Sequence, residues 1–317
     1  MNNQTIHTLA GIVLGLALVA GLPAPAPAAP VEVGDVTWGR SLEAAQRTAR
    51  ETQKPILILF QEVPGCQGCR TFGRDVLTHP LLVEAMEDEF VPLLIHNNTP
   101  GEDARLLKYF KEPAWNYQVI RFFDADLKEI IPRRDRVWNL GGVARRMALA
   151  LGAAGKRVPP YLTTLANLEE TDQHREVIFA MACFWVGEFE LGRLPGVLTT
   201  EAGWYDGREV TRVVFHNRHT SLEKLVDQAA RVDCARRVYL PRGTPPPTTR
   251  LEIFPFDARN YRRADPGDQK KQIQNWKALK AVPHINAQQL TRLNAWAPID
   301  RARALDWLSP RQQRHLK

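Results

Sequence analysis

Two of the four cysteines are spaced for thiol–disulfide chemistry. Cys66 and Cys69 form a Cys-x-x-Cys pair, so a helix that begins at the first cysteine carries the second about one turn further on. Unpaired backbone N–H groups at a helix N-terminus stabilise a thiolate and lower its pKa. The second thiol can then attack the mixed disulfide and release the partner. The spacing therefore predicts redox exchange.

Two other roles for this pair stay open. The cysteines could form a permanent disulfide, or they could supply half of a zinc site. A zinc site needs two further ligands, and the chain has no second Cys-x-x-Cys and no His-x3-His. The sequence favours redox exchange over both, and it predicts no metal. Nucleotide and flavin motifs are absent as well, so no cofactor is expected.

The residues around the pair predict the elements that position it. The run 55–60 is continuously apolar and of strand length, as expected for a strand that is buried on both faces. A helix is expected over 41–52 before this strand, and the chain is expected to enter another helix after Cys69. Strand, short loop, Cys-x-x-Cys and helix thus follow in the order that redox chemistry requires. Further on, we expect a helix over 81–89 and strands over 90–95 and 118–124.

This part of the chain resembles the thioredoxin-like family, especially members with a tryptophan ahead of the first helix and a Lys-Pro-Ile-Leu strand before the motif. Both features are present, at Trp38 and at 54–57. The resemblance implies a central mixed sheet flanked by helices, with Cys66 as the attacking thiol and Cys69 as the resolving thiol. One departure is Gln118, which stands where family members usually carry a cis-proline facing the disulfide.

A third cysteine, Cys183, also stands where a strand is expected to give way to a helix. The apolar run 176–182 precedes it, and Phe184 and Trp185 follow it. Over 176–226 the chain resembles the A-type peptide methionine-sulfoxide reductases, with Ala-Cys-Phe-Trp-Val in place of their Gly-Cys-Phe-Trp-Gly segment. A Leu-Pro-Gly-Val turn at 194–197 follows in the same order as in that family.

The resemblance implies a chemistry for the residues around Cys183. A thiolate attacks the sulfur of methionine sulfoxide, and the departing oxygen must be protonated, so the site needs a nucleophile, an acid and an apolar pocket. The family pattern makes Cys183 the nucleophile and Glu209 the acid, and it makes Phe184 and Trp185 the residues that hold the methyl group. The product is a sulfenic acid on Cys183, which a second thiol must resolve.

The family's two site tyrosines have no direct counterpart. The first corresponds to Trp204, and the adjacent Tyr205 could substitute for it. The second belongs to an Asp-x-Gly-x-Gln-Tyr-Arg-Ser segment, for which the nearest stretch is 233–239, with Cys234 about where the tyrosine would stand. Cys234 could therefore resolve Cys183, and the Cys66/Cys69 pair could reduce the resulting disulfide. A structural disulfide and a buried, inert thiol are the alternatives for Cys234.

The N-terminus predicts export. Residues 9–22 form an apolar or small-residue run, and an Ala-x-Ala site ends at Ala28, as in a cleaved signal peptide. An uncleaved anchor is the alternative, although the run is shorter than the ~20 residues that span a bilayer. The net charge of +7 is spread along the chain, which argues against a nucleic-acid partner. We expect a periplasmic protein, and a monomer because no apolar heptad is evident.

Together these features predict an α/β protein of two domains. Residues 1–28 are the signal peptide, 35–155 a thioredoxin-like domain, and 172–317 an α+β domain of ferredoxin-like type related to the sulfoxide reductases. The predicted function is thiol-dependent reduction of methionine-S-sulfoxide in exported proteins, with Cys183 as nucleophile and the Cys66/Cys69 pair as reductant within the same chain. A further thiol donor is expected to reduce that pair. The alternatives are a disulfide-exchange protein that works through the first domain, and an inactive adaptor with a degenerate second domain.

Overall fold

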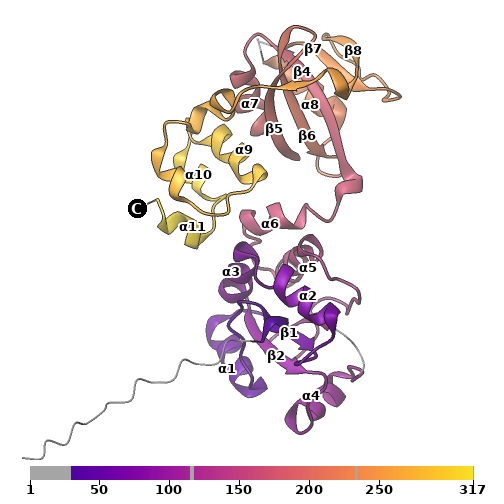
Figure 1. Ribbon diagram of the computed structural model, residues 1–317, viewed down its shortest axis with the longest axis vertical. Coiled ribbons are helices and arrows are strands. Elements are labelled where there is room, and N and C mark those ends of the chain that lie inside the picture. The colour runs from indigo at the N-terminus through magenta and orange to yellow at the C-terminus, as the bar shows by residue number, and fades with distance from the viewer. Residues whose placement is uncertain (1–29, 115–117, 233–234, 317) are drawn as a thin grey trace, which may run out of the picture.

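The computed structural model describes residues 30–114, 118–232 and 235–316, which form two domains stacked along the long axis of the molecule (Figure 1). The first domain contains six helices and three strands within these residues. They are α1 (Leu42–Thr52), β1 (Ile56–Gln61), α2 (Gln67–Asp75), α3 (Pro80–Glu89), β2 (Val91–His96), α4 (Glu102–Phe110), β3 (Gln118–Phe123), α5 (Leu140–Ala153) and α6 (Pro160–Ala166). The expected signal peptide lies outside the described residues.

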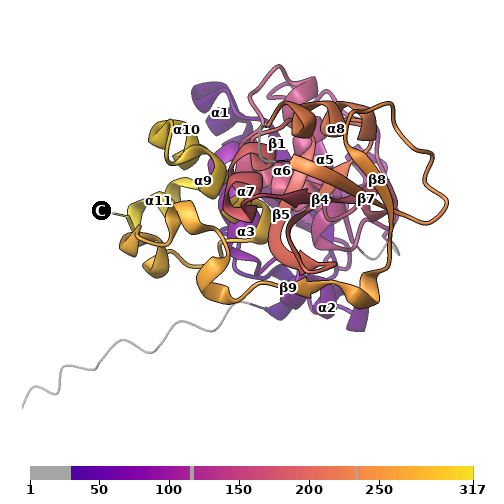
Figure 2. The same ribbon diagram turned by 90° about the horizontal axis from the view of Figure 1, so that it is seen from above.

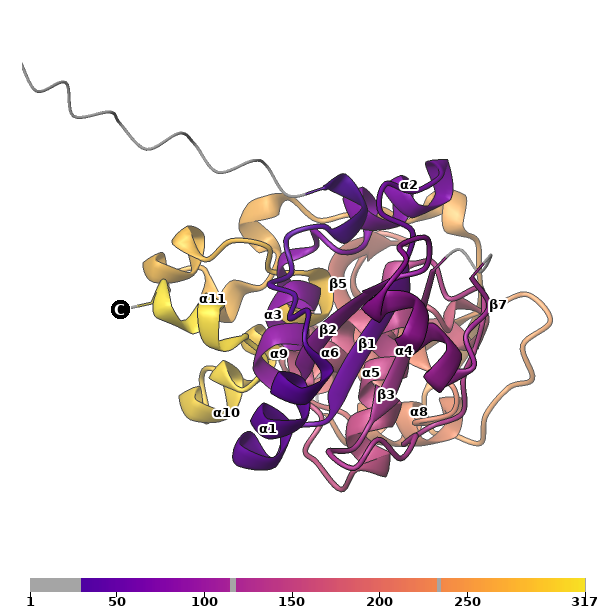
Figure 3. The same cartoon turned by 90° about the horizontal axis from the view of Figure 1, so that it is seen from below.

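The first sheet has β1 at its centre, parallel to β2 and antiparallel to β3 (Figure 3). All six residues of β1 are buried, as its apolar sequence predicts. Leu57 and Leu59 point into a core shared with α2, α3, α5 and α6, whereas Ile58 and Phe60 point into a core shared with α1 and α4. Helices therefore cover both faces, and the carboxyl end of β1 leads directly into the Cys-x-x-Cys loop.

The second domain is built on a mixed six-stranded sheet in the order β8-β7-β4-β6-β5-β9. Its elements are β4 (His174–Met181), α7 (Phe184–Gly192), β5 (Val197–Tyr205), β6 (Arg208–His216), α8 (Leu222–Arg231), β7 (Ala235–Pro241), β8 (Glu252–Phe256) and β9 (Arg262–Arg263). Helices α7 and α8 pack on one face of the sheet, over a core that includes Phe179, Leu191, Val213, Val226 and Val238. The other face carries a smaller cluster around Tyr205 and Tyr239.

The C-terminal segment packs against both domains. Its helices are α9 (Ala287–Trp296), α10 (Arg301–Leu305) and α11 (Pro310–Arg314), which lie to one side of the second sheet (Figures 1 and 2). The segment before α9 forms two short 3-10 helices, Lys271–Ile273 and Lys277–Ala281. α9 packs along α7, while the residues that begin α11 bind α3 of the first domain.

The contact between α11 and α3 centres on a buried carboxylate. Glu84 is 2% exposed, and its two oxygens accept hydrogen bonds from Ser309 Oγ at 2.5 Å and from the backbone N–H of Arg311 at 2.6 Å. A side-chain bond from Asn286 to Thr164 in α6 adds a second link at 2.7 Å. The tail thus ties the second domain to the first. Among the described residues, no helix is both long and apolar enough to cross a membrane.

Two candidate thiol sites

The first candidate site lies where β1 gives way to α2. Cys66 caps the N-terminus of α2 with an extended backbone (φ −67°, ψ 174°), and its side chain is exposed. Cys69 lies in the first turn of the helix and is fully buried. The two sulfurs are 3.6 Å apart. One thiol is therefore accessible to a partner, and the second stands behind it within reach of the same sulfur.

The loop before Cys66 is held by side chains from outside it. Asn98 accepts a hydrogen bond from the Val63 N–H at 3.2 Å and donates one to the Pro64 carbonyl at 2.9 Å. The Gly65 N–H donates to Glu32 Oε1 at 3.1 Å. A Cβ on Gly65 would lie 2.6 Å from the Cys69 Cβ, so only glycine fits there without a shift. These contacts fix where the Cys66 sulfur stands.

Burial dominates the electrostatics of the second thiol. The pKa of Cys69 is raised to about 12, first because burial disfavours the thiolate, and then because of the hydrogen bond to Cys66 and the charge of that neighbour. Glu62 Oε2 lies 4.0 Å from the Cys69 sulfur. Cys69 is therefore a protonated thiol in the reduced pair. This fits a resolving residue that reacts only after Cys66 has formed a bond to a partner.

Gln118 completes the surroundings of this pair. It is the first residue of β3, pairs with Gln61 of β1, and is buried. Its amide oxygen lies 3.7 Å from the Cys69 sulfur. Gln118 therefore faces the buried member of the cysteine pair.

The second candidate site lies at the corresponding junction of the other domain, between β4 and α7. Cys183 caps the N-terminus of α7 with an extended backbone (φ −148°, ψ 117°) and is partly buried. The next N–H of the helix, that of Phe184, donates to Glu209 Oε2 at 2.9 Å. Glu209 in β6 stands opposite Trp204 in β5. The sheet thus brings a carboxylate to the start of the helix that Cys183 caps.

Aromatic rings form one wall of this site. The Phe184 ring contacts Trp204 edge to face at 5.6 Å between centroids, and Trp185 in the same manner at 5.9 Å. Cations stand over both indoles: the Lys271 ammonium lies 4.5 Å from the Trp185 ring centre, and the Arg262 guanidinium 5.7 Å from that of Trp204. Four of the expected site residues, together with Cys183, are therefore gathered here.

Tyr205 does not join them, which corrects its expected role as a substitute for the missing tyrosine. Neighbouring residues in a strand point to opposite faces, so Tyr205 faces away from Trp204. Its hydroxyl accepts a hydrogen bond from the Asp257 N–H at 3.0 Å, and its ring packs against Tyr239 and Phe256. The other expected member, Cys234, lies outside the described residues.

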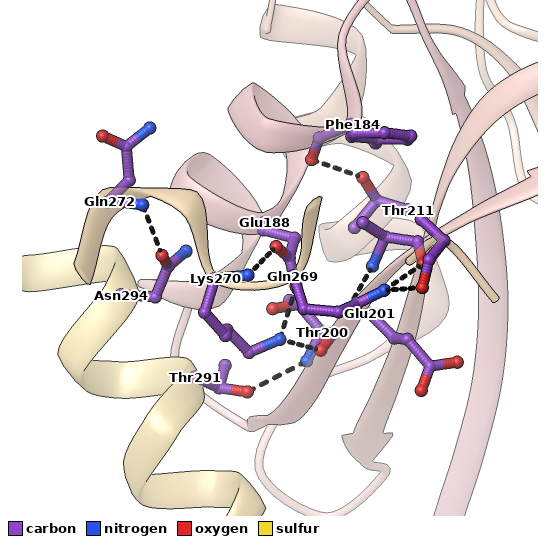
Figure 4. A network of polar contacts seen from close by, with 12 residues as sticks. Phe184, Glu188, Thr200, Glu201, Thr211, Gln269, Lys270, Gln272, Thr291 and Asn294 are labelled. Atoms are coloured by element: carbon purple, nitrogen blue, oxygen red, sulfur yellow. Dashed lines mark hydrogen bonds and ion pairs between the residues drawn. The ribbon is translucent and has the colours of Figure 1, made fainter. Parts of the chain in front are cut away.

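Sequence reasoning also missed a segment that packs against this site. An Asp-x-Gly-x-Gln pattern occurs at 265–269, and Lys270 follows it. The Gln269 amide bonds the Ala202 carbonyl at 2.7 Å and the Ala202 N–H at 3.2 Å, which joins the segment to β5 (Figure 4). The spacing of Asp, Gly and Gln was the available sequence signal for this segment.

Lys270 is engaged in an ion pair below the site. Its ammonium pairs with Glu188 of α7, whose side chain is fully buried, and also donates to the Thr200 carbonyl (Figure 4). The Lys270 N–H donates to the other Glu188 oxygen at 2.8 Å. Lys270 therefore fastens its segment to α7.

Comparison with known proteins bears on the first site. A family model described as thioredoxin-like matches residues 37–125. These residues form a thioredoxin-like domain. No curated protein matches. Among solved structures, a chain titled "DsbH Oxidoreductase" is similar at 18% sequence identity, with 44% of this chain and 97% of that chain covered and a TM-score of 0.33.

The thioredoxin-like domain does not present its cysteine pair to Cys183. β4 begins at His174, next to the connection from α6, and runs away from the thioredoxin-like domain (Figure 1). Its eight residues rise about 3.3 Å each, so the strand carries the chain roughly 26 Å further from the connection before it reaches Cys183. Direct transfer from Cys66 to this region therefore requires a different arrangement of the domains or a second molecule.

Proposed function

We propose that this protein is a thiol–disulfide oxidoreductase that works through Cys66 and Cys69. The observation that carries the proposal is the pair of sulfurs 3.6 Å apart, one exposed at a helix N-terminus and the other fully buried. The exposed thiol can reach a disulfide in another protein. The buried thiol can reach only Cys66 and whatever is bonded to it.

The exchange balances as two substitutions at sulfur. The Cys66 thiolate attacks one sulfur of a substrate disulfide, and the other substrate sulfur leaves as a thiolate. Cys69 then loses its proton and attacks the Cys66 sulfur, which releases the second substrate thiol. The substrate disulfide has been reduced by two electrons, and Cys66 and Cys69 have been oxidised to a disulfide. A thiol donor must then reduce the pair for another turnover.

Reduction of insulin by the full-length protein, with dithiothreitol as donor, tests the proposal. We expect turnover that falls to the uncatalysed background in both Cys66→Ser and Cys69→Ser. Cys183→Ser is the matched control, and it should retain the full rate. Equal rates for all four proteins and for buffer would exclude this function.

A second candidate function is reduction of methionine-S-sulfoxide at Cys183. The observation that favours it is the Glu209 carboxylate at the N-terminus of α7, beside the wall formed by Phe184, Trp185 and Trp204. The β-α-β-β-α-β order of β4 to β7, with strand order β7-β4-β6-β5, supports the ferredoxin-like domain on which this function rests. Oxidised methionine residues of other proteins are the substrates in this proposal.

The chemistry of this candidate uses the same carboxylate as an acid. The Cys183 thiolate attacks the sulfoxide sulfur, Glu209 donates a proton to the oxygen, and methionine leaves with Cys183 as a sulfenic acid. A peptide with the S-epimer of methionine sulfoxide tests it. Cys183→Ser should abolish turnover, whereas Cys66→Ser should retain a first turnover. No turnover by the folded wild-type protein would exclude this second function without affecting the first.

The setting of both activities is part of the proposal. The apolar run and Ala-x-Ala site before residue 29 support export to the periplasm. Structural disulfides are formed in that compartment, so substrates for Cys66 and Cys69 are present there. The protein acts as a monomer in this proposal, with a separate thiol donor as its redox partner.

A further inference from the structure

The Cys66/Cys69 site holds more potential metal ligands than disulfide exchange requires. One oxygen of Glu62 and the sulfurs of Cys66 and Cys69 all lie within 4.8 Å of one another. Glu62 follows β1 directly and directs its carboxylate towards the buried sulfur. The Gln118 amide oxygen approaches the same sulfur from β3. Two sulfur atoms and two oxygen atoms thus converge from three separate elements of the fold.

The distances from the Cys69 sulfur to the other three atoms are close to those between the ligands of a tetrahedral ion. With Zn–S bonds of about 2.3 Å and Zn–O bonds of about 2.1 Å, two sulfur ligands lie about 3.8 Å apart, and a sulfur and an oxygen ligand about 3.6 Å apart. The Cys66 and Cys69 sulfurs are 3.6 Å apart. Cys69 Sγ lies 3.7 Å from the Gln118 oxygen and 4.0 Å from the Glu62 oxygen. These three distances differ from the tetrahedral values by about 0.1–0.4 Å.

We propose that the reduced Cys66/Cys69 pair, together with Glu62 and Gln118, binds one thiophilic divalent cation of the zinc class. Thiolate sulfur favours zinc over magnesium or calcium, and carboxylate oxygen is a common zinc ligand. No familiar zinc-binding sequence pattern marks this set, because its oxygen ligands, Glu62 and Gln118, are far apart in the sequence. Exposure of Cys66 gives the ion a path from solvent.

Binding is an acid–base event without electron transfer. Both thiols release their protons to the buffer as the two sulfur–metal bonds form, and the ion keeps its charge. The bound thiolates cannot attack a disulfide or form one with each other. Zinc therefore holds the site in a reduced and inactive state until a chelator removes the ion. This inference does not depend on the activity proposed above, because it concerns binding by the dithiol alone.

A titration of the reduced full-length protein with Zn²⁺, in competition with a chromophoric chelator, tests the inference. Co²⁺ serves as a spectroscopic probe, because thiolate ligands give a sulfur-to-cobalt charge-transfer band. The variants are Glu62→Gln and Gln118→Leu, each of which leaves both cysteines in place. Glu51→Gln, an exposed carboxylate of α1, is the matched control. Circular dichroism establishes that each variant is folded.

We expect one zinc ion per reduced chain, no binding by the protein with a Cys66–Cys69 disulfide, and unchanged affinity in Glu51→Gln. Glu62→Gln should bind at least ten-fold more weakly, and Gln118→Leu should also bind more weakly. If the Glu62→Gln protein is misfolded, the zinc affinity of Gln118→Leu alone tests whether an oxygen ligand contributes. Wild-type affinity in the folded oxygen-ligand variants would reduce the site to an ordinary dithiol chelator and overturn the inference. Absence of binding by the reduced wild-type protein would overturn it as well.

Discussion

The two thiol sites share one local construction and differ in what stands behind the thiol. Cys66 and Cys183 each cap a helix that directly follows a strand, with an extended backbone at the cap. Behind Cys66 lies a second thiol at 3.6 Å. Beside Cys183 lies the carboxylate of Glu209, held by the Phe184 N–H. The first site can complete an exchange with its own residues, whereas the second needs a resolving thiol from elsewhere.

The two sites also differ in how widely their residues are separated in the sequence. The first is assembled from Glu32, 61–69, Asn98 and Gln118, all of which belong to the first domain. The second depends on a C-terminal segment around Gln269 and Lys270, which is fastened to β5 and α7. The two sites therefore differ in how much they depend on the C-terminal segment. The first site should tolerate changes in the tail, and the second should not.

The largest expected difference between the two sites concerns a trapped covalent intermediate at Cys66. In Cys69→Ser, Cys66 can still attack a disulfide substrate, but nothing releases it, so a stable mixed disulfide should accumulate to about one per chain. In Cys66→Ser no adduct should form at this site, because Cys69 is fully buried. Non-reducing electrophoresis and mass spectrometry measure the adduct.

Both trapping variants are made in a Cys183→Ser, Cys234→Ser background, so that only the first site can react. An adduct of equal yield in the Cys66→Ser chain would mean that Cys69 is accessible. That result would contradict the division into an attacking and a resolving thiol.

The local architecture of the first site could be predicted from the sequence because neighbouring residues determine it. The run 55–60 is continuously apolar, which predicts a strand that is buried on both faces. The loop that follows this strand leads to Cys66. Gln118 was predicted to begin a strand, and the structure places its amide oxygen beside the Cys69 sulfur. The oxygen of Glu62 was not predicted as a neighbour of Cys69, since the side-chain direction depends on how Asn98 holds the loop.

The second site was predicted only in part, for two physical reasons. Cys183, Phe184 and Glu209 meet because adjacent elements of one sheet bring them together. Tyr205 was misplaced because strand alternation, and not proximity in sequence, decides which face a residue lines. Lys270 was missed because its partner Glu188 is distant in sequence, and no local pattern marks that ion pair.

The dependence of the second site on the tail is tested by Lys270→Met. This change leaves the Glu188 carboxylate buried without its cation, which should cost about 3–5 kcal/mol of unfolding free energy. Lys271→Met is the neighbouring control, because that ammonium only stands over the Trp185 ring and should contribute about 0.5–1 kcal/mol. Urea unfolding measures both, and iodoacetamide labelling of Cys183 should be faster in Lys270→Met.

Disulfide reduction by the first site should be unchanged in the same Lys270→Met protein under native conditions. Loss of insulin reduction with intact folding of the thioredoxin-like domain would show that the two sites are coupled. The first site would then depend on the C-terminal tail, as the second does.

The contact between the domains is tested by Ser309→Ala. The Ser309 hydroxyl donates to the buried Glu84 carboxylate and caps α11, so its removal should cost about 1.5–3 kcal/mol. Ser221→Ala is a matched control, since that hydroxyl only caps α8 and should cost about 1 kcal/mol. Unfolding in urea compares the two. Equal costs would mean that the bond to Glu84 contributes nothing, and that the tail is held by its apolar contacts alone.

The smallest expected effect is on the pH dependence of stability, and it concerns His216. This residue is fully buried at the end of β6, near the connection between the domains. Its ring faces Glu170 Oε2 at 3.0 Å, the stacked ring of His219 at 4.2 Å and the ring of His174 at 5.9 Å, and its Nδ1 accepts from the Arg218 N–H. Burial, more than the charge of its histidine neighbours, lowers the pKa of His216 below its ordinary value of about 6.5.

Because the pKa of His216 is lowered in the folded state, the sign of its effect on stability at low pH can be predicted. Below about pH 6.5 the unfolded chain binds a proton at this residue before the folded chain does, so stability falls as the pH falls, by no more than about 1.4 kcal/mol per pH unit. Urea unfolding between pH 7.5 and pH 5 should therefore show a shallower decline in His216→Gln than in the wild type. His315→Gln, at an exposed position near the C-terminus, is the control and should follow the wild type. A decline as steep in His216→Gln as in the control would assign the acid sensitivity to other groups, and His216 would then be a purely structural partner of Glu170.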